Sequence, residues 1–132
     1  MDERVQFLRD RLDEDQAAAS RAGDSFRQIG ETGVIVATDG DRAEECASAN
    51  WAGIAEHIVR HDPARVLAEV ESKRQNLAEL KAAEEAMDRA ARDRDTVGYN
   101  AVRAEWTVLK RVVLRDLSVY ADHPAYKPEW RP

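Results

Sequence analysis

Three histidines and one cysteine are the side chains whose types and spacing could support metal chemistry. His57 and His61 are four residues apart, so on a helix their rings share one face and could bind one ion. Cys46 precedes His57 by eleven residues, which is about 16 Å along a continuous helix and too far to share that ion. His123 would have to come from the C-terminal segment. A small metal-binding protein or enzyme that uses the three histidines, for example as a zinc site, is one hypothesis, and histidines at a helix corner that bind no metal are the simpler interpretation.

Patterns for catalysis are missing from the chain. Ile58 follows His57 where a metalloprotease H-E-x-x-H motif needs glutamate, and the serines lack a G-x-S-x-G elbow. The pair His61-Asp62 is similar to a phosphohydrolase metal dyad, but such sites need further histidines and an aspartate. Cys46 is expected to be a small buried side chain rather than a nucleophile. We therefore predict a protein that is not an enzyme and that holds no cofactor and no metal.

Charge is unevenly distributed along the chain. Residues 1–50 hold 6 Lys/Arg against 12 Asp/Glu, and residues 51–132 hold 14 of each. A nucleic-acid site needs concentrated positive charge, so this balance argues against one. The alternative hypothesis is a nucleic-acid binder that contacts phosphates through a stripe of four basic residues, Arg60, Arg65, Lys73 and Arg74. Interleaved glutamates favour ordinary ion pairs along a helix instead.

Length and composition predict one cytoplasmic domain. A chain of 132 residues with 35% charged residues suits a single helical domain, residues 1–132. Its single cysteine excludes an internal disulfide and favours a reducing compartment. No apolar run approaches 18 residues, so no membrane span is expected.

Apolar periodicity predicts the elements that must position these residues. A first helix is expected over 2–20, where Val5, Leu8 and Leu12 recur at helical spacing. Asp62 as cap and Pro63 at the first helical position predict that a long helix begins there. This helix and the next form an antiparallel helical hairpin over 63–119, with Asp95 or Thr96 as the second cap.

The region between these helices is predicted to be mixed. Two β-rich runs around Gly30–Gly33 predict a β-hairpin over 25–38, with a loop as the alternative. Asp41 and Glu44 have the spacing of a capping box, which predicts a helix over 41–60. The fold class is thus mainly α with minor β: an antiparallel helical hairpin, two further helices and a small β-hairpin.

The C-terminal residues 121–132 predict an extended tail. This segment has three prolines and no periodicity, but its Tyr126 and Trp130 are costly to leave in water. We therefore expect the tail to run along the helices with both rings docked.

Two segments carry a family resemblance: HDPARVLAEVESKR at 61–74 and YADHPAYKPEWRP at 120–132. The chain resembles a domain-of-unknown-function family of short actinobacterial and actinophage proteins. The motif residues are His61, Asp62, Pro63, Arg65, Tyr120, Asp122, His123, Pro124, Tyr126, Glu129, Trp130 and Arg131. The resemblance implies a phage or prophage accessory protein, and it implies no chemistry for these residues.

The sequence favours a non-enzymatic protein–protein interaction module. Its partner would be an unidentified host or phage protein. Val112 and Val113 face different sides of the last helix, and so wide an apolar arc suggests a homodimer through the helical hairpin.

Overall fold

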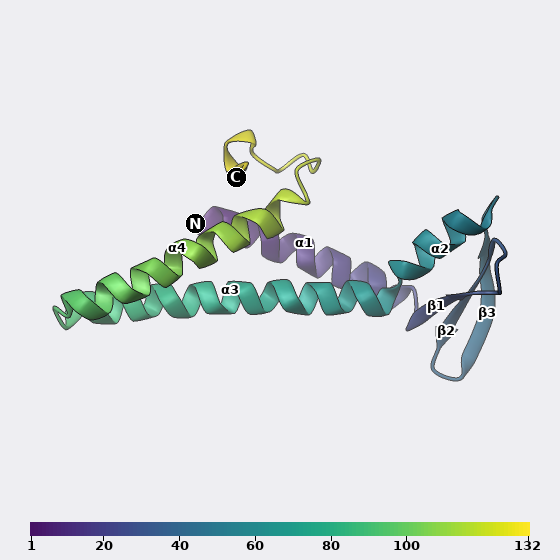
Figure 1. Ribbon diagram of the computed structural model, residues 1–132, viewed down its shortest axis with the longest axis horizontal. Helices are drawn as coiled ribbons and strands as arrows, with labels where there is room; N and C mark the ends of the chain where they lie inside the picture. Colours follow the sequence, from purple (N-terminus) through teal and green to yellow (C-terminus); the bar gives the residue numbers. More distant parts are fainter. The chain divides into compact units, whose positions relative to one another are not determined.

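The computed structural model describes all residues, 1–132, and shows a mainly α fold with a small antiparallel sheet, as predicted (Figure 1). Contacts group the chain into two compact units, one of residues 13–71 and one of residues 1–12 with 72–132. Helices α1 (Asp2–Arg21) and α3 (Pro63–Arg92) contribute to both units. Each helix is too short or too polar to cross a membrane.

A three-stranded sheet forms the centre of the 13–71 unit. Strands β1 (Ser25–Gln28), β2 (Val34–Asp39) and β3 (Arg42–Ser48) are antiparallel neighbours in that order. The predicted β-hairpin over 25–38 is confirmed, and the loop alternative is wrong. Ile35 and Val36 of β2 are buried, whereas every residue of β3 is exposed. The sheet therefore has a core in its middle strand and an open edge at β3.

The predicted helix over 41–60 is wrong in its first half. Residues 42–48 form β3, and only Ala52–Arg60 is helical, as α2. Gly40 has φ +59° between the paired residues Asp39 and Arg42, so Gly40-Asp41 makes a two-residue hairpin turn. Asp41 is thus a turn residue and not a helix cap. Pairing with β2 overrides the helix preference of the alanines and glutamates in this stretch.

Helix α3 and helix α4 (Thr96–Ser118) form the predicted helical hairpin. Asp95 caps α4, because its side chain accepts a hydrogen bond of 2.9 Å from the Gly98 amide. Side chains of α1, α3 and α4 form the core of this unit, and the fully buried ones are Leu8, Leu12, Leu80, Val113 and Leu117. These positions follow the apolar spacing that predicted the helices.

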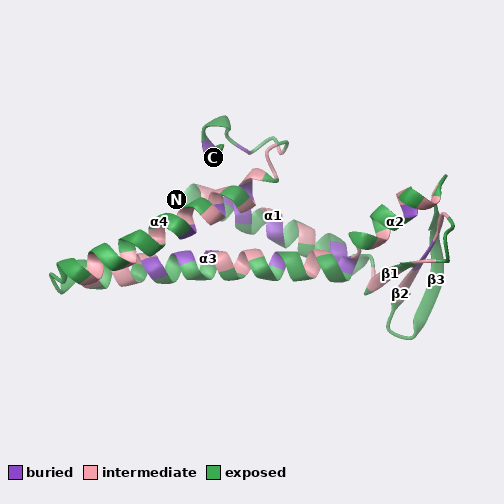
Figure 2. Cartoon of the chain, viewed as in Figure 1, coloured by how far each residue is buried: buried purple, intermediate pink, exposed green.

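The distal part of the hairpin lacks a third helix. The first turns of α1, from Asp2 to Arg9, line a hollow with Leu77–Glu84 of α3. Beyond that level, residues 85–108 contain no buried side chain. Figure 2 shows that the first part of α4 has no buried residue, whereas its last part, toward the C-terminus of the helix, does. Two helices alone cannot enclose an apolar stripe, so this part leaves apolar surface in contact with solvent.

Candidate functional site

His57 and His61 lie together at the end of α2. Both side chains are exposed, and their ring centroids are 4.5 Å apart with the planes tilted by 40°. His61 Nδ1 lies 2.8 Å from the backbone oxygen of His57. A carbonyl oxygen can only accept, so Nδ1 carries the proton and Nε2 of a neutral His61 ring carries the lone pair. The rings therefore share one face, as the spacing predicted.

His123 belongs to the other unit and has different partners. Its Nδ1 lies 3.0 Å from Arg11 Nη1 and accepts a hydrogen bond of 3.0 Å from the Ala125 amide. Both partners are donors, so Nδ1 of His123 is an acceptor and its proton lies on Nε2. No group of three or more histidine, cysteine, aspartate or glutamate side chains in the chain is arranged to hold a metal ion.

Asp62 connects two elements through its carboxylate. Oδ1 accepts a hydrogen bond of 3.0 Å from the Arg65 amide in the first turn of α3, which confirms the predicted helix cap. Oδ2 accepts a hydrogen bond of 3.2 Å from the Phe26 amide of β1. Asp62 therefore fixes the start of α3 against the sheet. The sequence predicted the helix cap but not the hydrogen bond to β1.

The tail is docked through a cluster of aromatic rings, as predicted. Tyr126 and Trp130 are 8% and 5% exposed, and the rings of Tyr126, Trp130 and His123 lie 5.3–5.9 Å edge-on from the Phe7 ring of α1. A short 3₁₀ helix, Pro128–Trp130, turns Trp130 inward. These contacts give the second motif a structural function, which is to hold the C-terminus on α1.

Lys127 adds an ionic contact to the docked tail. Its ammonium group pairs with the Glu3 carboxylate and lies 5.7 Å from the Trp130 ring. The hydrogen bond with Glu3 raises the pKa of Lys127 above its ordinary value, although the group is in solvent. A raised lysine pKa means that this contact is complete below the unfolded-state pKa and is lost only in strongly alkaline solution.

The cations of the proposed phosphate-binding stripe already have partners. Arg60 pairs with Glu56 at 3.2 Å and Arg65 with Glu69 at 3.0 Å, both one helical turn apart. Lys73 lies over the Tyr120 ring at 5.4 Å. Carboxylates that neutralise two of these cations make them weak phosphate ligands.

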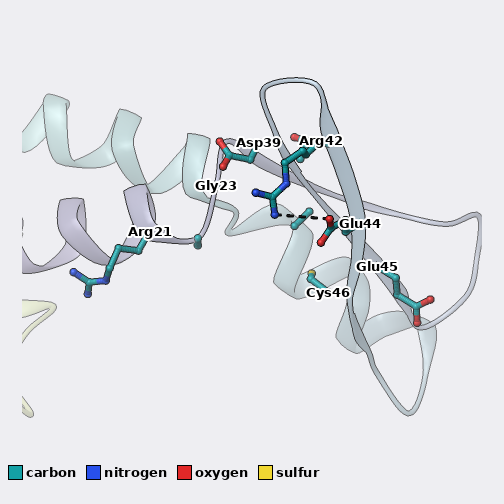
Figure 3. Close-up of a pocket in the computed structure, with 10 residues that line it drawn as sticks. Arg21, Gly23, Asp39, Arg42, Glu44, Glu45 and Cys46 are labelled. Carbon is teal, nitrogen blue, oxygen red and sulfur yellow. Dashed lines mark ion pairs between the residues drawn. The ribbon is translucent and has the colours of Figure 1, made fainter.

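Cys46 is exposed on β3, so the prediction of a buried thiol is wrong. Ile35 pairs with Ala47 and Val36 with Glu45, which leaves Cys46 as the extra residue of a β-bulge. A hollow of about 240 Å³ beside it includes Arg42 and Glu44, which form an ion pair (Figure 3). No histidine lines this hollow to act as a base for the thiol.

The outward side of α4 carries a second apolar stripe that the core does not use. We call Val97, Ala101, Ala104 and Val108 the outer stripe; all four are exposed, and Val97 and Val108 are 83% and 51% exposed. Val108 and Leu109 are adjacent, so they point about 100° apart. Leu109 is buried against the core, and the outer stripe faces solvent.

Comparison with known proteins gives one match. A family of unknown function, DUF6221, matches residues 1–132. No curated protein and no solved structure matches the chain. Because the match spans every residue from the first helix to the docked tail, the chain belongs to the family DUF6221.

Proposed function

We propose that this protein is a non-enzymatic protein–protein interaction module, and that the outer stripe of α4 is its binding surface. The observation that carries the proposal is the exposure of four apolar side chains at helical spacing, on a helix whose buried residues Leu109, Val113 and Leu117 begin only after the stripe ends. Single exposed apolar residues are common, but an aligned set marks a surface for helix packing. The Asp95 cap begins the helix that carries this surface two residues before Val97.

The spacing of the outer stripe favours a second copy of this chain as its occupant. Val-Ala-Ala-Val recurs at intervals of four, three and four residues, and this order is the same in both directions. Two copies of α4 packed antiparallel therefore place Val97 opposite Val108 of the partner subunit and Ala101 opposite Ala104 of the partner subunit. A two-fold interface requires such self-complementarity, and the alanines allow the two backbones to approach closely.

Charge near the stripe does not oppose this association. Residues 85–108 contain five acidic and four basic side chains, so they are almost neutral, unlike the acidic residues 1–50. The contact from Val97 to Val108 is about 17 Å long. An interface of that length is smaller than a typical stable one, so we expect a weak dimer that dissociates on dilution.

Light scattering across a concentration series tests the proposal. The wild type should rise from 14.9 kDa toward twice that mass as concentration increases. Ala104→Glu places a charge in the centre of the stripe and should stay monomeric. Thr107→Glu is the matched control, because Thr107 is exposed on the same turns but off the stripe, and it should behave as wild type.

Other results would contradict the second copy as occupant. A wild-type mass of 14.9 kDa at every concentration would overturn the dimer. A defined host or phage protein that binds the wild type and Thr107→Glu but not Ala104→Glu would be the occupant of the stripe in place of a second copy. A dimer that survives Ala104→Glu would place the interface elsewhere on the chain.

The resemblance of the two motifs also supports a phage or prophage accessory role. The motif residues cap a helix and dock the tail, so they maintain the fold that presents α4. A cytoplasmic location agrees with an exposed, unpaired thiol at Cys46, which a reducing compartment would preserve. Genes for phage structural or regulatory proteins beside this gene would support the role, and a housekeeping operon would contradict it.

A further inference from the structure

We propose that His57 and His61 form a surface chelate for a divalent transition-metal ion of the zinc and copper class. Two exposed imidazoles one turn apart, with ring centroids 4.5 Å from each other, lie close enough together to serve as two ligands of one ion. The site has two protein ligands, and water completes the coordination. It uses α2 and does not depend on the outer stripe of α4.

The hydrogen bond of His61 orients one of the ligands. Its Nδ1–H donates to the His57 carbonyl oxygen over 2.8 Å, so Nε2 of the neutral ring presents its lone pair to solvent. Histidines that bind metals commonly donate their other ring N–H to a backbone carbonyl in this way, which sets both the tautomer and the ring direction. The carbonyl that accepts here belongs to the other ligand residue, so one contact joins the two halves of the chelate.

The ring separation fits chelation without movement of the backbone. Zinc lies about 2.0–2.1 Å from each imidazole nitrogen, so two nitrogens on one ion are about 3 Å apart. From a centroid distance of 4.5 Å, rotation of the His57 side chain would bring its nitrogen toward Nε2 of His61 while His61 keeps its hydrogen bond. His61 is the C-cap of α2, and its amide bonds to the Ile58 oxygen at 3.1 Å. The backbone at both ligands is therefore already fixed.

Local charge permits a cation at this position. The guanidinium groups of Arg60 and Arg65, which neighbour the two histidines in the sequence, pair with Glu56 at 3.2 Å and with Glu69 at 3.0 Å. The C-terminal end of α2, where His61 lies, has the negative end of the helix dipole. The ion pairs reduce the repulsion between the arginines and a bound cation, and the helix dipole attracts that cation.

Calorimetric titration of the metal-free full-length protein with zinc chloride tests the proposal. The wild type should bind one ion per chain, and His57→Ala or His61→Ala should weaken the affinity at least tenfold. The double variant Glu56→His with His57→Ala keeps two histidines but places them five residues apart. It should bind no more tightly than His57→Ala, while His123→Gln should bind as wild type.

NMR of the wild type supplies a result that needs no variant. Zinc should shift the imidazole resonances of His57 and His61 together and leave those of His123 unchanged. The proposal is overturned if zinc shifts only one of the two rings, if the double variant binds as well as wild type, or if only His123→Gln loses binding.

Discussion

At the scale of single residues, Asp62 holds two elements with one carboxylate. Its oxygens accept from the Arg65 amide of α3 and the Phe26 amide of β1. Asp62→Ala removes the cap, which costs about 1 kcal/mol, and leaves the partly buried Phe26 amide without its acceptor, which costs about 1 kcal/mol more. Urea unfolding should therefore show a loss near 2 kcal/mol. Asp62→Asn keeps one acceptor oxygen and should lose about half of that, and an unchanged midpoint for Asp62→Ala would refute the connection.

Two glycines of the same unit should respond to alanine with opposite signs. A Cβ at Gly33 would lie 2.0 Å from the Ala49 oxygen, far inside van der Waals contact, so Gly33→Ala forces the backbone apart. Such overpacking costs about 1–3 kcal/mol. A Cβ at Gly53, in the first turn of α2, would meet the Trp51 ring at an ordinary 3.5 Å. Gly53→Ala should stabilise the protein by about 0.5–1 kcal/mol in thermal unfolding, and two losses of equal size would contradict this account.

At the scale of elements, the docked tail should be an integral part of the fold. Trp130→Ala removes a ring that contacts Phe7 and Tyr126 and is 5% exposed. Its loss should cost about 3 kcal/mol, and truncation after Ala121 should lower solubility as well. With Trp51 and Trp106 replaced by phenylalanine, the remaining Trp130 should emit at short wavelength. Solvent-like emission from that ring would show that the tail is not docked.

The hairpin of α3 and α4 should differ in local stability along its length. Residues 85–108 contain no buried side chain, whereas Leu80, Val113 and Leu117 are at most 1% exposed. Amide hydrogens near the Asp93–Asp95 turn should therefore exchange with solvent faster than those near Val113, because local opening exposes little additional apolar surface. Uniform protection along both helices would contradict this expectation.

At the scale of the whole molecule, association of two copies should change the melting temperature of the protein. If two copies pair through the outer stripe, mass action raises the melting temperature as protein concentration increases. Ala104→Glu should abolish that dependence, and Thr107→Glu should retain it. A melting temperature that is the same at all concentrations in the wild type would count against a dimer.

The sequence determined α1, α3 and α4, where each of these three helices begins, and the docking of the tail. Asp62-Pro63 and Asp95 mark helix starts because capping needs only a local side chain and two or three neighbouring amides. Apolar spacing placed Leu8 and Leu12 on one face of the first helix, and both are fully buried, since periodicity on one helix is also a local property.

Tertiary structure alone decided the strand at 42–48, and the geometry of the α2 end decided the tautomer of His61. The alanines and glutamates of residues 42–48 favour a helix locally, but hydrogen bonds to β2 stabilise the strand by more than that local preference. The bulge in the same pairing leaves Cys46 exposed to solvent. The spacing of His57 and His61 predicted a shared face, yet only the contact with the His57 carbonyl determined which nitrogen of His61 is free. The pairing of β3 joins it to a neighbouring strand whose position depends on the folded backbone, so the local pattern at 42–48 did not encode it.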